Sequence, residues 1–80
     1  MLYKLDQCAT AHAYEIKFDG KVNLDKLAEK FEILSKMPVV LMVKINNKPI
    51  TVYASGRAML KDVTKEEAEK IAETLNKAVD

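Results

Sequence analysis

Apolar and polar residues alternate one by one along four stretches of the chain, and this period of two is typical of a strand with one buried face. The stretches are 10–18, 39–46, 50–55 and 57–61. In the first of them, Tyr14, Ile16 and Phe18 share one face. Residues that favour turns separate the stretches, at 19–21, 46–49 and 55–56. The pattern therefore predicts four strands, of which the last three are joined by tight turns.

Two other stretches have apolar residues at intervals of three and four, which indicates amphipathic helices. Asn23 is a good N-cap for the first helix. Its apolar positions are Leu24, Leu27, Ala28, Phe31 and Leu34. Because Pro38 disfavours helical geometry at the residue before it, we expect this helix to end near Ser35 or Lys36. In the second helix, Thr64 and Glu67 have the spacing of a capping box. Its apolar stripe consists of Ala68, Ile71, Ala72, Leu75, Ala78 and Val79.

The predicted order of elements is strand, helix, three strands, helix. Each helix has one apolar stripe and each strand one strongly apolar face, so we expect both helices on the same side of an antiparallel sheet. The predicted fold class is therefore α+β, a two-layer sandwich in which one sheet face stays open. Residues expected between the layers are Val39, Leu41, Val43, Ile45, Val52, Leu60, Ile71 and Leu75. Tyr53 is expected to be less buried than Val52.

Several short motifs resemble one repeat of the TATA-box-binding protein family. Segment 51–79 has a strand, a Ser-Gly turn, a strand and a helix with an acidic start, as in the closing half of such a repeat. Further matching motifs are Ile16-Lys17-Phe18, Leu24-Asp25-Lys26-Leu27-Ala28, Met37-Pro38 and Tyr53-Ala54-Ser55-Gly56-Arg57. The resemblance covers about 11–79. It implies one domain over 1–80, with the curved sheet of half a TATA-box-binding protein, in a small stand-alone version of archaeal type.

The departures from the family pattern imply that this chain does not recognise the TATA sequence specifically. Met37 and Tyr53 stand where the family has phenylalanines that wedge between base pairs and kink the DNA. Ala11 stands where the family has an asparagine that contacts the minor groove, and alanine has no hydrogen-bond donor. Lys61 lies near a family threonine, and Asp62 replaces a glycine. Similar domains also bind substrate in one class of ribonuclease H and in some DNA glycosylases, so the fold alone does not imply promoter binding.

Composition limits the functions that the chain can have. The 80 residues suffice for one domain, with 13 basic and 12 acidic side chains and a net charge of +1. Overall charge therefore provides no attraction to nucleic acid or to an anionic membrane. The chain has no apolar run approaching about 18 residues, the length that would indicate a transmembrane helix. The start of the chain also lacks the apolar region of a signal peptide. We expect a soluble, cytoplasmic protein that does not bind membranes.

Candidate catalytic residues are scarce. The single histidine, His12, has no defined acid–base partner, and we expect it to point toward the core side of the sheet. The single cysteine, Cys8, excludes an internal disulfide. Together these two residues fall short of the four ligands of a structural zinc site. No phosphate-binding loop, dinucleotide motif or nucleophile elbow is present. We therefore expect no enzymatic activity, no cofactor, no metal and no small-molecule substrate.

The open sheet face is the predicted place of function. Strand alternation assigns to it Ala11, Ala13, Glu15, Lys17, Val40, Met42, Lys44, Thr51, Tyr53, Ser55, Arg57, Met59 and Lys61. Four of these are basic and one is acidic, around an apolar centre. An exposed sheet face commonly has such residues without any function, but a contiguous apolar patch favours a binding surface. Candidate binding residues are Lys17, Met37, Val40, Met42, Lys44, Thr51, Tyr53, Arg57, Met59 and Lys61.

Two functions remain for this face. The first is a non-enzymatic interaction module that binds a protein partner or a second copy of itself. The alternative is a nucleic-acid-binding domain without TATA specificity. The near-neutral charge and the replaced DNA-contacting residues favour the first. Salt dependence distinguishes them, because neutralisation of phosphates makes affinity fall steeply with salt.

Overall fold

The computed structural model describes residues 2–7 and 13–79. Within these residues, six strands form one antiparallel sheet in the order β1-β2-β6-β5-β4-β3. The strands are β1 (Tyr3–Gln7), β2 (Ala13–Phe18), β3 (Glu32–Lys36), β4 (Val40–Ile45), β5 (Lys48–Tyr53) and β6 (Arg57–Lys61). The helices are α1 (Leu24–Ala28) and α2 (Lys65–Val79). The predicted α+β class is confirmed, and the sheet has an additional strand at each edge.

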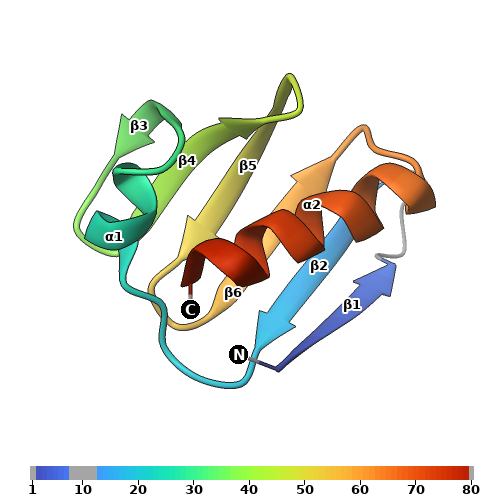
Figure 1. Cartoon of the computed structure of the whole chain (residues 1–80), viewed down its shortest axis with the longest axis horizontal. Coiled ribbons are helices and arrows are strands. Elements are labelled where there is room, and N and C mark those ends of the chain that lie inside the picture. The colour runs from blue at the N-terminus through green and yellow to red at the C-terminus, as the bar shows by residue number, and fades with distance from the viewer. Residues whose placement is uncertain (1, 8–12, 80) are drawn as a thin grey trace.

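Both helices lie on the same side of the sheet (Figure 1). The long helix α2 crosses in front of the sheet, and α1 lies beside the β3–β4 edge. The Lys30 side chain, just after α1, donates a hydrogen bond to the Ala78 carbonyl of α2 at 3.2 Å. Within the described part of the chain, no helix or loop covers the other side of the sheet. That open side is where binding was predicted.

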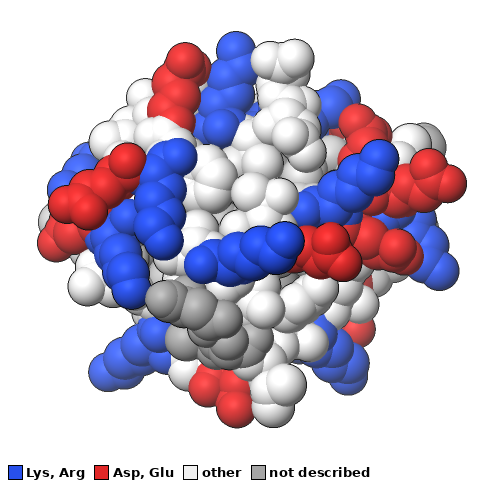
Figure 2. All heavy atoms as spheres, viewed as in Figure 1, with Lys and Arg blue, Asp and Glu red and all other residues white. Residues whose placement is uncertain are grey.

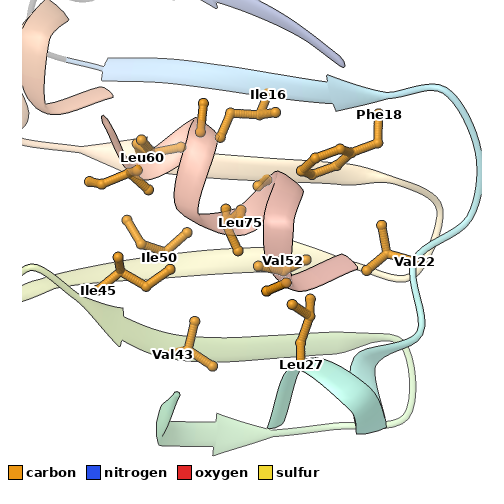
Figure 3. Packing of buried hydrophobic residues seen from close by; sticks show 14 of the residues in the cluster. Ile16, Phe18, Val22, Leu27, Val43, Ile45, Ile50, Val52, Leu60 and Leu75 are labelled. Atoms are coloured by element: carbon orange, nitrogen blue, oxygen red, sulfur yellow. The ribbon is translucent and has the colours of Figure 1, made fainter. Parts of the chain in front are cut away.

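The core fills the space between the sheet and the helices (Figure 3). Seven of the eight residues predicted to be buried are at most 3% exposed. Val52 is fully buried and Tyr53 is 37% exposed, as expected from the strand alternation. Val39 was wrongly predicted, because it is 64% exposed. It precedes β4, in the turn after β3, where its carbonyl accepts a hydrogen bond from the Ala54 N–H at 3.0 Å.

The first helix is much shorter than predicted. The Asn23 side chain caps it by accepting a hydrogen bond from the Lys26 N–H at 3.1 Å, but the helix ends at Ala28. The residues expected to continue it, 32–36, form β3 and pair with β4. Leu34 fits the helical spacing of apolar residues, but it is 47% exposed and does not belong to the core. Pairing with β4 gives this segment the backbone hydrogen bonds that a longer helix would have supplied.

The second helix agrees with its prediction. The Thr64 N–H donates to the Glu67 carboxylate at 2.9 Å, and the Glu67 N–H donates to the Thr64 hydroxyl at 3.2 Å. These two bonds form the predicted capping box. The apolar stripe of α2 packs on the sheet, and Leu75 is fully buried at its centre. The hydrogen bond from the Thr64 backbone also lowers the pKa of Glu67 below its ordinary value of 4.5.

Candidate protein-binding surface on the open sheet face

The turn between β5 and β6 fixes the position of the central residues of the open face. Gly56 in this turn has a φ of +104°, and its carbonyl accepts a hydrogen bond from the Phe18 N–H at 2.7 Å. A Cβ at Gly56 would collide with the Gly20 carbonyl oxygen. The turn is therefore packed tightly against the segment that follows β2. As a result, Tyr53 and Arg57, on either side of the turn, have fixed backbone positions.

Cross-strand register arranges the open-face side chains in rows. In one row, Lys17 is opposite Arg57, Arg57 is opposite Tyr53, and Tyr53 is opposite Val40. Residues that are directly opposite in a sheet have Cβ atoms about 4.5–5.5 Å apart. This row is therefore a continuous strip of side chains, basic at the β2 end and apolar at the β4 end.

A second row lies beside the first. Its successive members are Glu15, Met59, Thr51 and Met42. All four are partly buried although no helix or strand covers them, because neighbouring side chains of the same face shield them from water. Lys44 and Lys61 are exposed beyond this row, opposite Pro49 and Ala13 respectively. The structure thus places nine of the ten candidate residues on one face.

Met37 lies apart from the other nine. It belongs to the turn between β3 and β4 and is 50% exposed. It lines a hollow of about 580 Å³ together with Val22, which precedes α1, and Leu24 and Asp25 at the start of α1. Sequence alternation could not place this residue, because it precedes the strand over which the alternation holds.

Tyr53 borders two neighbouring hollows of the surface. It lines a hollow of about 600 Å³ with Glu15, Ser55, Arg57 and Met59. It also lines a second hollow of about 410 Å³ with Lys21, Val39, Ala54 and Ser55. Tyr53 and Val39, at 37% and 64% exposure, therefore give the surface two accessible apolar side chains beside concave regions. The sequence pattern did not place Val39 on this surface, because it started the strand at Val39 instead of Val40 and so assigned Val39 to the core.

The open face is less basic than the sequence indicated. The Glu15 carboxylate lies 3.7 Å from the Lys17 Nζ and 3.9 Å from the Arg57 Nη1, so one acid accompanies two of the four predicted basic residues. The edge strands add Lys4, opposite Lys17, and two acids, Asp6 opposite Glu15 and Glu32 opposite Lys44. Among described residues, the face then has five basic and three acidic side chains, a net charge of +2 instead of +3. Figure 2 shows that the opposite, helix-bearing face also mixes both signs.

Some predictions concern residues that the structure does not describe. Cys8, Ala11 and His12 lie outside the described residues. Over 2–7 and 13–79, no group of three or more His, Cys, Asp or Glu side chains is arranged to hold a metal ion. In the same part of the chain, no helix is both long and apolar enough to cross a membrane.

A comparison of the chain with models of known families, with curated proteins and with solved structures finds no match. Function must therefore be inferred from the surface itself. Among the described residues, the open face offers the partly exposed ring of Tyr53, flexible methionines and a group of charges that Glu15 only partly neutralises, beside open hollows. Such a surface is suited to binding a macromolecule, because methionine adapts to irregular partners and aromatic residues provide a large contact area.

Proposed function

We propose that this domain is a non-enzymatic interaction module that binds a protein partner through the open face of its sheet. The observation that carries the proposal is the position of Tyr53. Its side chain is 37% exposed between two hollows, in rows that also contain the partly buried Val40, Met42 and Met59. Aromatic residues near the centre of a patch, with a surround that excludes water, commonly supply most of the energy of a protein interface.

The charges of this face favour a protein over a nucleic acid. Glu15 lines the larger hollow and lies within 4 Å of both Lys17 and Arg57. A phosphate placed near these two basic side chains would also meet the Glu15 carboxylate. The face would thus lose part of the attraction on which nucleic-acid binding depends.

Nucleic-acid binding remains the alternative, and one observation favours it. Lys4, Lys17 and Arg57 are successive neighbours across β1, β2 and β6 and form a row of three cations. Such a row has the local charge that phosphates require even when the whole chain is nearly neutral.

We also propose that the chain is a single repeat related to the TATA-box-binding protein. The motifs quoted above support this relationship. Further support comes from the order of elements over 13–79, a strand, a helix, further strands and a helix, with both helices on one side of the sheet. The relationship does not favour DNA as the ligand, because the residues that contact DNA in the family are replaced here.

Selection of peptides from a display library on the immobilised domain tests the proposed function. The Tyr53→Ala substitution should lower the affinity of the domain for the selected peptides by roughly 30-fold, as expected for an aromatic anchor worth about 2 kcal/mol. Tyr3→Ala is the matched control, since Tyr3 is also 37% exposed but lies in β1 on the helix-bearing side, opposite Phe18. Peptides that bind wild type and Tyr53→Ala equally would contradict the proposal.

A titration with a mixed-sequence DNA duplex at two salt concentrations tests the alternative. We expect weak binding that changes little in the Arg57→Glu/Lys61→Glu variant. Tight binding that falls steeply with salt, and that this variant abolishes, would instead establish nucleic acid as the ligand.

A further inference from the structure

The outer strand β1 places like charges opposite each other on the open face. Lys4 is opposite Lys17, and Asp6 is opposite Glu15. Like charges directly opposite in a sheet destabilise the pairing. Among the described residues, neither Lys4 nor Asp6 takes part in an ion pair, whereas Glu15 contacts both Lys17 and Arg57. Within one copy of the chain, the charges of β1 are thus in an unfavourable arrangement.

The free edge of β1 has a defined set of backbone groups. The Leu2 carbonyl accepts a hydrogen bond from the Asp19 N–H at 2.9 Å, so the backbone of Leu2 faces β2. Backbone groups alternate in direction along an antiparallel strand. Those of Lys4 and Asp6 therefore also face β2, and those of Tyr3, Leu5 and Gln7 point away from the sheet. These three residues present the N–H and C=O groups that another strand would require.

The sequence of β1, Tyr-Lys-Leu-Asp-Gln, is complementary to itself when it is paired antiparallel about Leu5. Leu5 is then opposite Leu5 of the second copy, and Tyr3 is opposite Gln7. Lys4 is opposite Asp6 on both sides of the two-fold axis. We propose that two copies of this chain form a dimer by antiparallel pairing of β1 with β1, centred on Leu5.

The backbone directions and the charges agree on this register. Tyr3, Leu5 and Gln7 fall at hydrogen-bonded positions, so every outward N–H and C=O group of β1 gains a partner. The two Lys4–Asp6 pairs fall at the non-hydrogen-bonded positions, where side chains come closest, with Cα atoms about 4.5 Å apart. Lys4 and Asp6, which each have a like-charged residue opposite them on β2, thereby each gain an opposite charge across the interface.

The other edge of the sheet lacks this complementarity. In β3, Glu32 pairs with Lys44 on the open side, and Lys36 pairs with Leu41 on the helix side, because a bulge shifts the register between them. The two charges of β3 are therefore on different faces. Lys36 also contacts the Asp25 carboxylate at 2.8 Å within its own chain. Of the two edges, β1 is the one suited to pair with itself.

The two-fold axis of such a pair is perpendicular to the sheet, so the helices of both copies lie on one side. The two open faces then form one continuous surface, with a Tyr53 in each half. The dimer does not depend on the proposed function, because its contacts lie at the edge of the sheet and Tyr53 lies on β5.

Charge reversal tests the dimer, with molar mass measured by sedimentation over a range of protein concentrations. With Lys4→Asp both charged side chains of β1 are acidic, and with Asp6→Lys both are basic. Each variant alone should dissociate at least tenfold more readily than wild type. An equimolar mixture of the two should form a heterodimer, and the double variant Lys4→Asp/Asp6→Lys should dimerise as wild type does. Tyr53→Ala should leave dimerisation unchanged.

Loss of folding is distinguishable from loss of the dimer. Each single reversal replaces a like-charge pair inside the chain by an opposite-charge pair, so thermal melts at low protein concentration should show stability equal to or above that of wild type. Gln7→Pro is a second, uncharged test, because it removes an N–H that points away from β2. A wild-type chain that stays monomeric up to about 1 mM would overturn the proposal. So would a dimer that is indifferent to both reversals and to Gln7→Pro.

Discussion

At the scale of single residues, Gly56 has no room for a side chain. Its φ of +104° is one that side-chain-bearing residues rarely adopt, and the Gly20 carbonyl occupies the place of a Cβ. The same residue holds the end of β2 through the hydrogen bond from Phe18. The geometry of the open face around Tyr53 therefore depends on a residue that has no side chain.

We expect Gly56→Ala to lower the free energy of unfolding by at least about 2 kcal/mol, from backbone strain together with the steric overlap. Gly20→Ala is the matched control, since Gly20 also has a positive φ but has nothing within 4 Å of its Cβ position. Urea denaturation should show a smaller loss for Gly20→Ala. Equal losses would mean that the overlap at Gly56 is relieved by movement of the chain.

Among the helices and strands, α2 has the most clearly defined start. Its capping box satisfies the backbone N–H of Glu67 and that of Thr64. We expect Thr64→Ala to cost about 1 kcal/mol of stability, because it removes the hydroxyl acceptor. Thr64→Ser retains the acceptor and should cost much less in the same denaturation experiment. If both variants lost equal stability, the methyl group and not the hydrogen bond would be responsible.

The capping box also predicts a dependence of stability on pH. The pKa of Glu67 is lowered in the folded chain, chiefly by the hydrogen bond from the Thr64 N–H. A lowered pKa means that the folded state favours the ionised carboxylate. Its contribution to stability is therefore present above the ordinary value of 4.5 and is lost as the pH falls through the folded pKa. In thermal melts between neutral and acidic pH, the Glu67→Gln variant should lose less stability than wild type as the pH falls below about 4.5.

The same elements show how far the sequence determines the fold. The stripe and cap of α2 could be predicted because fifteen consecutive residues repeat one pattern and begin with a specific hydrogen-bonded motif. The strand β3 could not, because Phe31 and Leu34 continue the helical spacing of Leu24 and Leu27 by coincidence. No glycine marks the end of α1, and Leu34 is apolar but exposed. Only pairing with β4, a tertiary interaction, decides between helix and strand there.

The strand β1 was missed for a different reason. Tyr3 and Leu5 alternate with Lys4 and Asp6, which is the period of a strand. The alternation covers only the five residues of β1, which is too short a pattern to predict a strand by itself. The omission affected the site as well, because β1 and β3 contribute three charged side chains that lower the net charge of the open face.

For the molecule as a whole, the two sides of the sheet differ in how much their side chains contribute to the stability of the fold. Side chains on the helix side belong to a core of nineteen residues within the described part of the chain, whereas those on the open side are only partly shielded. We expect Leu60→Ala to cost about 2–5 kcal/mol, as other large-to-small changes in protein cores do. Tyr53→Ala should cost less than about 1 kcal/mol, the range of cross-strand contacts. A larger loss from Tyr53→Ala in chemical denaturation would show that Tyr53 maintains the fold instead of a binding surface.

The position of α2 also has a consequence for the time at which the domain folds during its synthesis. This helix follows all six described strands along the chain, yet its buried residues complete the core over β2, β5 and β6. Until α2 has left the ribosome, Ile16, Val52 and Leu60 have no apolar layer to pack against. A nascent chain that ends at β6 would therefore expose one apolar sheet face to chaperones. We therefore expect the sheet to gain most of its apolar packing only once α2 has been synthesised and closes over it.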